Sequence, residues 1–365
     1  SEGTRDMATV EESGMDRWLI GGGAEHTQES ARRLVFTATG GASGVGGVSD
    51  MLVRPLAIPG TGVRVAVGSC LMPSRFIGGE TQSYQAAAFR EQLLSIAPNQ
   101  TNTDRYDLIV IRVEDGFAAN SSWPKPPEAD RANEQYIYAR VIPGVAANAT
   151  ILQKLPNQAN TTGYALARVR VPAFTGTITA SLITDLRAVA QPRRTEVVYA
   201  RPRITADDGA QTFLTATVAN GGEYFPGGNG VANQFEVDVP EWATRILIEA
   251  TWMSVSQIGT PHGRYWMEFG DEYRPHTWPD KRQFEFYTQH FGFNAANTAD
   301  EKNDTWVAMD ELPLAAKLRG KTISFAFKAG NNSVFAAQHK TWMNSLGGLG
   351  ARITFAERAL DSDLL

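Results

Sequence analysis

One segment of this chain gathers the residue types that could act on a sugar. Glu268, Asp271 and Glu272 lie within the stretch RYWMEFGDEYRPHTWPDK, where aromatic residues surround them. Two carboxylates that flank a glycosidic bond are the catalytic groups of most glycoside hydrolases. However, acidic residues are common in the turns that follow strands, and nothing in the sequence fixes how far apart these three lie. We therefore predict that the protein is not an enzyme.

The same segment fits sugar binding better than sugar hydrolysis. Aromatic rings stack on the apolar faces of sugars, and nearby carboxylates accept hydrogen bonds from the hydroxyls. The predicted glycan-binding residues are Trp266, Asp271, Tyr273, Trp278 and Trp306. Trp278 lies between Thr277 and Pro279, so it is the ring most expected to be exposed. The alternative for each ring is packing in a core or against a neighbouring subunit.

Other reactive residue types form no recognisable constellation. The five histidines include no His-x-x-x-His pair and none adjoins the cysteine, so we predict no metal site. No Gly-x-Ser-x-Gly motif and no phosphate-binding Gly-Lys-Ser/Thr motif occurs. The single cysteine, Cys70, lies in a strand-like run without a basic cluster, which is typical of a small buried hydrophobe. We predict no catalytic residues and no cofactor.

The sequence indicates that strands form the framework of this protein. Two segments show clear strand patterns. The apolar run from Leu108 to Val113 is too short for a buried helix and too continuous for a half-exposed strand. It predicts a central strand covered on both faces. Residues 163–171 alternate with period two. We expect one face to carry Ala165, Ala167, Val169 and Val171, and the other Leu166, Arg168 and Arg170.

The segments around these two strands also predict a β-structure. Residues 51–73 contain two or three strand-like runs separated by Pro59-Gly60 and Gly62. The Ala-rich segment 84–96 has helix propensity, but the Pro98-Asn99 that closes it favours a strand, which we predict. Residues 121–131 hold three prolines and are expected to be a surface loop, after which 135–144 restarts a strand.

Composition changes near residues 190–203, a stretch with two prolines that suits a connector. Six of the eight tryptophans lie beyond it. About eight strand-like runs follow, separated by Gly, Pro or Asn, and indicate a jelly-roll-like sandwich. We therefore predict an all-β chain with an N-terminal arm (1–50), a β-sandwich domain (51–195) and a second, jelly-roll-like β-sandwich (196–365).

The predicted arm is polar and acidic at its start, passes Trp18-Leu19-Ile20 and meets Gly21-Gly22-Gly23. We expect one strand at residues 33–39, before a Gly-rich stretch that cannot carry a core of its own. Two interpretations stay open: the arm packs on a neighbouring subunit, or it is a flexible terminus.

Residues 51–194, well under half of the chain, resemble the minor tail or baseplate proteins of siphophages that infect actinobacteria. The resemblance rests on an Arg-x-Asp before an apolar strand that ends Arg-Val-x-Asp, a Pro-rich loop, a Leu-Ala-Arg-Val-x-Val-Pro-Ala strand and a closing Ile-x-Asp-Leu-Arg. The matching polar residues are Arg105, Asp107, Arg112, Asp115, Asp185 and Arg187. The chain departs from the pattern at Tyr106, where an aliphatic residue is common, and has Thr184 inside the closing element.

The resemblance implies a structural virion protein of the tail tip, an oligomeric scaffold that anchors to the tail and projects a β-sandwich domain. Its implied partners are other tail proteins and further copies of the chain, most readily a trimer around a threefold or sixfold axis. It assigns tail docking and oligomer contacts to the six polar residues. The alternative is a receptor-binding protein that recognises a cell-envelope glycan during adsorption.

Charge and hydropathy further limit the classes of partner that the chain is expected to have. The net charge of −5 offers no diffuse basic surface for nucleic acid. No apolar stretch is long enough to span a membrane, and the N-terminal residues do not resemble a secretory signal. With a single cysteine, these features indicate assembly in a reducing cytoplasm. The resemblance implies that this is the cytoplasm of the bacterial host, and that the protein is then incorporated into the virion at the tail tip.

Overall fold

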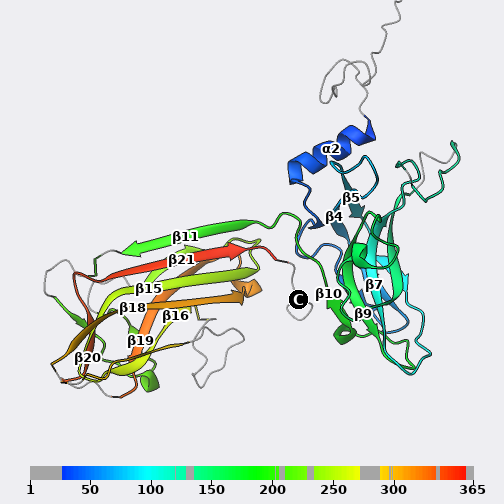
Figure 1. The fold of residues 1–365 in the computed structure, drawn as a ribbon. Coiled ribbons are helices and arrows are strands. Elements are labelled where there is room, and N and C mark those ends of the chain that lie inside the picture. Colours follow the sequence, from blue (N-terminus) through cyan, green and yellow to red (C-terminus); the bar gives the residue numbers. More distant parts are fainter. Residues whose placement is uncertain are drawn as a thin grey trace, which may run out of the picture. The chain divides into compact units, whose positions relative to one another are not determined.

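The computed structural model describes residues 27–119, 121–128, 135–201, 203–204, 210–227, 234–271, 288–295, 297, 299–333 and 338–358. The chain divides into two compact units, which are described separately: unit 1 comprises residues 1–191 and 359–365, and unit 2 comprises 192–358. Strands dominate both units (Figure 1). The all-β prediction is therefore correct.

The connector prediction needs correction. The two units divide between Gln191 and Pro192. However, most of the predicted connector is strand β11 (Arg194–Arg201), which pairs with β21 (Gly348–Ala356) over its whole length. Its apolar side chains Val197 and Tyr199 pack against the core of unit 2. The β-branched run between the prolines was thus a strand signal.

The predicted strand at residues 33–39 is wrong, because this segment belongs to the helix α2 (Gln28–Thr39). The Thr27 hydroxyl caps the helix by accepting a hydrogen bond from Ser30 N, and Gly40 ends it in the left-handed conformation at φ 61°. The predicted arm also extends too far. Strand β1 (Gly44–Val45) joins a sheet of unit 1, and Val45 is fully buried in its core.

Unit 1 contains three sheets around one main core. Their strand orders are β1-β4-β5, β2-β3-β6 and β10-β9-β7-β8. The bounds are β2 (Val53–Pro55), β3 (Gly62–Val65), β4 (Gly68–Pro73), β5 (Ser83–Ala88), β6 (Gln92–Ser95), β7 (Arg105–Val113), β8 (Ile137–Val145), β9 (Gly163–Val171) and β10 (Ile183–Asp185). Short 3₁₀ turns lie at Leu152–Lys154 and Ala180–Leu182. The strands predicted within 51–73 are confirmed, whereas the single strand predicted at 84–96 is two strands, β5 and β6, which belong to different sheets.

β7 is the central strand that its apolar run predicts. It lies between β9 and β8. Ile109, Ile111 and Val113 belong to the main core, whereas Leu108 and Val110 belong to a smaller core on the opposite face. Leu152 and Leu155, from the segment between β8 and β9, cover that second face. The sequence of a strand that is buried on both faces is continuously hydrophobic rather than alternating.

The two faces predicted for β9 are only partly right, because a β-bulge interrupts the alternation. The register against β7 shifts: Ile109 lies opposite Ala167, but Val110 lies opposite Ala165. The extra residue, Leu166, joins Ala167 in the main core, whereas Ala165 contributes to the smaller core. One inserted residue moves every side chain beyond it to the other face.

Unit 2 is a sandwich of two antiparallel sheets. One has the strand order β11-β21-β15-β20-β12, with β18 also paired to β15, and the other has the order β13-β19-β16-β17, with β14 also paired to β19. The bounds are β12 (Thr212–Phe213), β13 (Glu223–Tyr224), β14 (Gln234–Asp238), β15 (Arg245–Ile258), β16 (His262–Phe269), β17 (Gln289–Gly292), β18 (Glu301–Pro313), β19 (Thr322–Asn331) and β20 (Lys340–Met343). Further 3₁₀ turns lie at Val218–Asn220 and Ala316–Leu318.

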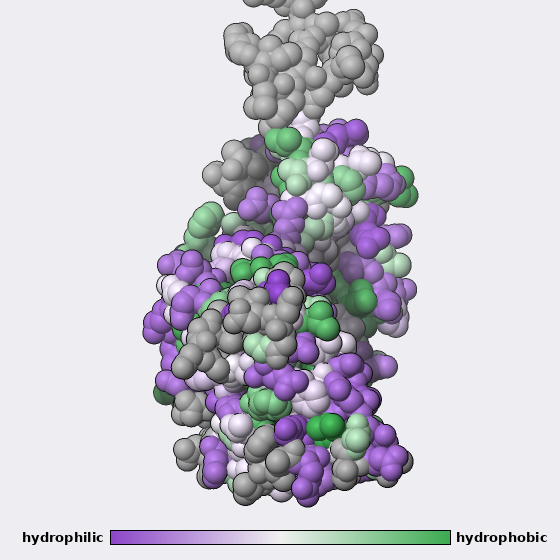
Figure 2. Space-filling model, turned by 90° about the vertical axis from the view of Figure 1, so that its left-hand side faces the viewer, coloured by the Kyte–Doolittle hydropathy of each residue, from purple (hydrophilic) through white to green (hydrophobic). Residues whose placement is uncertain are grey.

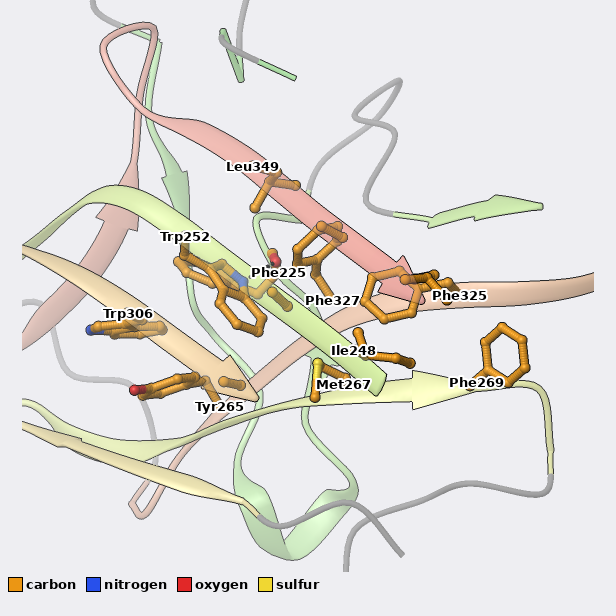
Figure 3. Close-up of a cluster of buried hydrophobic side chains, with 14 of the residues drawn as sticks. Phe225, Ile248, Trp252, Tyr265, Met267, Phe269, Trp306, Phe325, Phe327 and Leu349 are labelled. Atoms are coloured by element: carbon orange, nitrogen blue, oxygen red, sulfur yellow. Dashed lines mark hydrogen bonds between the residues drawn. The ribbon is translucent and has the colours of Figure 1, made fainter. Parts of the chain in front are cut away.

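Aromatic rings fill the core between these two sheets (Figure 3). Trp252 is fully buried, and its indole N–H donates to Phe225 O at 2.9 Å. Its ring meets Phe327 edge-to-face at 5.2 Å between centroids. Trp306 stacks on Tyr265 at 4.8 Å and on Phe291 at 4.5 Å. Such contacts give this core a large buried apolar area with defined ring geometry.

The surface is mixed in character. On the face drawn in Figure 2, hydrophobic residues form separate patches among hydrophilic ones. Among the residues that the structure describes, no helix is long and apolar enough to cross a membrane.

Candidate functional site

The resemblance residues Arg105 and Asp107 form a clamp inside unit 1. The guanidinium donates two hydrogen bonds to the Asp107 carboxylate, both at 2.8 Å, and a third to Ala97 O at 2.6 Å. Asp107 is fully buried and also accepts from Gly144 N at 3.1 Å. The pair therefore joins β7 to the loop before it and to the end of β8, where the register between the two strands shifts.

Asp185 and Arg187 form a second clamp of the same design. Arg187 Nη2 donates to Asp185 Oδ2 at 2.7 Å, and Nη1 donates to Asp50 O at 2.7 Å and Val48 O at 3.1 Å. The Arg187 side chain has no exposed surface. This arginine ties the end of β10 to the loop before β2.

A third cluster follows β7. Glu114 accepts hydrogen bonds from Arg112 at 2.6 Å and, through both oxygens, from Arg140 at 2.9 and 3.0 Å. Arg112 also lies over the Trp123 ring at 4.7 Å. Although burial opposes its ionisation, the hydrogen bonds and charges of Arg140 and Arg112 hold the pKa of Glu114 below its usual value.

The stability contribution of Glu114 is expected to depend on pH. Because its pKa is lower in the folded state, ionised Glu114 stabilises the fold above the unfolded-state pKa near 4.5. This contribution is lost as the pH falls toward the folded-state pKa. We expect Glu114→Gln to lower the urea midpoint of unit 1 at pH 7, with a difference that shrinks below pH ~4. Equal differences at pH 7 and pH 3 would contradict this assignment.

Asp115 bonds to a tyrosine instead of an arginine. Tyr84 O–H donates to Asp115 Oδ2 at 3.0 Å, and Phe117 N donates to Oδ1 at 2.8 Å. Desolvation raises the pKa of Tyr84, Asp115 reinforces the shift, and Arg32, 4.9 Å above the ring, opposes it. Tyr84 therefore acts as a neutral hydrogen-bond donor.

These contacts revise the roles expected for the six residues. The side chains of Asp107 and Arg187 are buried inside unit 1, so they cannot form a direct docking contact with another protein. Glu114, Arg140 and Tyr84 complete the clusters, and the sequence analysis missed them. A signal existed for Glu114, because residues two apart on a strand share a face and Arg112–Glu114 repeats the spacing of Arg105–Asp107 and Asp185–Arg187.

The predicted glycan-binding residues do not form one exposed platform. Trp306 is 2% exposed in the core, and Trp266 is 1% exposed on the opposite face of β16. Gly222, at φ 61°, covers the Trp266 ring so closely that a Cβ there would lie 2.4 Å from it. These two rings cannot stack on a sugar, so both assignments are corrected. Tyr273 and Trp278 lie outside the described residues, and Asp271 is exposed in the turn after β16.

The outer face around Trp266 carries a smaller polar cluster. Trp266 Nε1 donates to Glu268 Oε1 at 3.2 Å, and Lys328 Nζ lies 3.9 Å from the same carboxylate oxygen. Lys328 also lies over the ring of Tyr224 at 4.5 Å, and Tyr224 is 42% exposed. Tyr224 is therefore an exposed aromatic ring beside charged groups that the sequence analysis did not single out.

Cys70 has the buried position predicted for it. It is fully buried in the main core of unit 1, and desolvation raises the pKa of its thiol to about 12. Within the described residues, no three or more His, Cys, Asp and Glu side chains are placed to share a metal ion.

A cleft of about 1140 Å³ lies in unit 1 between α2, β5 and β8. Its floor includes Met51, Ala86 and Ile111 of the main core. Aromatic side chains line its sides, and Arg32 and Arg90 contribute positive charge. It is thus an apolar groove with a polar rim.

Comparison with known proteins identifies no family for this chain. No family model matches it, and no curated protein does. Solved structures of infectious bursal disease virus align with it at low similarity. The Gx strain structure has 11% identity and a TM-score of 0.22 over 88% of this chain and 74% of that chain. A mutant VP2 protein in derived T=1 particles has 12% identity and a TM-score of 0.23 over 91% and 80%. Such low scores establish neither the fold nor the function of this chain.

Proposed function

We propose that this chain is a structural virion protein in the tail tip or baseplate of a long-tailed phage. It is an oligomeric scaffold that anchors to other tail proteins and carries a second β-sandwich. Copies of the chain assemble with one another as a trimer around the threefold or sixfold axis of the tail. No catalytic step is part of this role. The proposal starts from the resemblance over residues 51–194.

The observation that carries the proposal is what the resemblance residues do. Arg105 with Asp107, and Asp185 with Arg187, bind to one another and to the backbone of neighbouring loops. Arg112 and Asp115 bind partners at the end of β7. The shared residues thus stabilise a sheet rather than line a reactive site, so the resemblance describes a mechanical module. Such a module supports a role as a building block.

The location of the chain in the particle tests the proposal. We expect the protein in purified virions by mass spectrometry, and we expect Fab fragments raised against unit 2 to label the tail tip in electron micrographs. Fabs against a major capsid protein of the same phage serve as the control and should label the head. Absence from the virion, or label on the head alone, would remove the tail-tip assignment.

A second candidate function is recognition of a cell-envelope glycan by unit 2. The exposed Tyr224 ring beside Lys328 and Glu268 favours it, because an aromatic ring with nearby charged groups suits a sugar. Phage carrying both Tyr224→Ala and Trp278→Ala should then adsorb at least tenfold more slowly to host cells at equal particle numbers. Unchanged adsorption would exclude glycan recognition by unit 2, and the scaffold role would be the one that remains.

A further inference from the structure

Two strand edges face each other across the cleft of unit 1. The lining residues are consecutive on both sides, Tyr84–Arg90 on one and Gln135–Ala139 on the other. Successive side chains of a strand point to opposite faces, so a consecutive run lines a groove with its backbone edge. Within the described residues, β5 pairs only with β4 and β8 pairs only with β7. Among the residues that the structure describes, β5 and β8 are thus the outer strands of their sheets, and each turns its outer edge to the groove.

Such a groove matches an extended polypeptide better than a compact ligand. A strand that enters it can hydrogen-bond to the backbone of β5 or β8, which is the basis of peptide recognition by β-augmentation. Its alternate side chains would point toward the apolar floor around Ile111 and Ala86. At the rim, Phe89 is 93% exposed and Phe117 is 45% exposed, so an apolar side chain would also gain contacts there.

The chain itself supplies a segment of this kind at the right place. The described part of the chain begins at Thr27, which caps α2, and Gln28, Ala31 and Arg32 of this helix line the cleft. Six residues, Gly21–His26, separate Thr27 from the apolar run Trp18-Leu19-Ile20. An extended linker of this length spans about 20 Å, and its three glycines allow a reversal of direction.

Charge favours the same occupant. Residues 1–26 contain six acidic residues and two arginines, whereas Arg32 and Arg90 lie at the cleft. The one carboxylate of the lining, Asp115, is already bonded to Tyr84. The apolar run Trp18-Leu19-Ile20 therefore suits the floor, and the acidic residues that flank it in the sequence, such as Asp16, suit the positive charge at the rim.

We propose that residues 17–21 of the chain bind in the cleft of their own unit 1 as an added strand, with Trp18 as the anchor. Binding within one molecule is favoured because the short linker keeps the segment at a high effective concentration. The cleft is thereby a built-in docking site for the N-terminal segment, and this assignment is independent of the proposed virion role.

Hydrogen exchange of the full-length protein tests whether the segment covers these strands. We expect backbone amides of β5 and β8 to exchange about tenfold more slowly in the wild type than in Trp18→Ala. Met7→Ala, an apolar truncation outside residues 17–21, should exchange like the wild type. The amides of β9 and β10, in the same unit but on the far side of the sheet from β8, report whether a variant destabilises unit 1 as a whole. Equal exchange at β5 and β8 in all three proteins would overturn the proposal.

Cross-linking distinguishes binding within one molecule from exchange between copies. Leu19→Cys with Ala87→Cys should give a monomeric product with a short bismaleimide, in a yield independent of protein concentration. Cys70 is fully buried and does not compete. Leu19→Cys with Thr184→Cys is the control, because Thr184 is exposed on β10, at the opposite edge of the sheet from β8. Equal yields for the two pairs, or cross-linked dimers alone, would overturn the assignment.

Discussion

In the Asp107→Ala variant, unit 1 is expected to lose about 3–5 kcal/mol of its free energy of unfolding, because breaking a buried ion pair leaves uncompensated groups. Asp107 is fully buried and accepts two hydrogen bonds from Arg105 and one from Gly144 N. Its removal leaves the guanidinium without its carboxylate partner and the Gly144 amide without its acceptor. Urea-dependent hydrogen exchange at peptides of β7 and β9 measures the change specifically in unit 1.

Asp104→Ala is the matched control for this prediction. Asp104 lies three residues earlier and pairs with Arg170 at 3.5 Å, but both side chains are well exposed, at 37% and 50%. Exposed ion pairs contribute at most about 1 kcal/mol, so this variant should stay close to the wild type. If the two variants lost similar stability, burial of the Asp107 carboxylate would not be the cause.

The second large effect is expected for Trp252→Ala in unit 2. Trp252 is fully buried between the sheets, contacts Phe327 edge-to-face and donates to Phe225 O. Truncation creates a large cavity and leaves that carbonyl without its donor, so we expect a loss of about 3–5 kcal/mol. The same exchange measurement at peptides of β15 and β21 reports this change.

Met253→Ala provides the comparison on the same strand. Met253 is the next residue and is 39% exposed, so its truncation should cost well below 1.5 kcal/mol. A loss at Met253 as large as that at Trp252 would mean that the strand, rather than the buried ring, limits the stability of unit 2.

Local patterns predicted the elements whose residues depend mainly on their neighbours in sequence. The continuous apolar run of β7 indicated burial on both faces, and the structure confirms it. The helix α2 was also encoded locally, by the Thr27 cap, Glu29 in the first turn and Gly40 at the end. The β-branched residues Val35, Thr37 and Thr39 favour a strand, so only the capping signals distinguish the helix in this segment.

The candidate sites depended on contacts between distant residues, which period and composition do not encode. Trp266 and Trp306 occur in similar aromatic surroundings in the sequence. Trp306 is buried between Tyr265 and Phe291, whereas Trp266 is buried under Gly222 on the other side of a sheet. The cleft in unit 1 lies between β5 and β8, which are the outer strands of two different sheets among the described residues, so its position depends on how those sheets pack.

By itself, the sequence determined the all-β class, the two-part organisation and the central position of β7, because strand periodicity and turn residues act over short distances. Only the tertiary structure decided which polar residues are internal and where a groove opens. Asp107 and Arg187 resemble surface residues in the sequence, but long-range packing buries them in ion pairs. Burial is a property of the assembled sheets, so no local pattern could fix it.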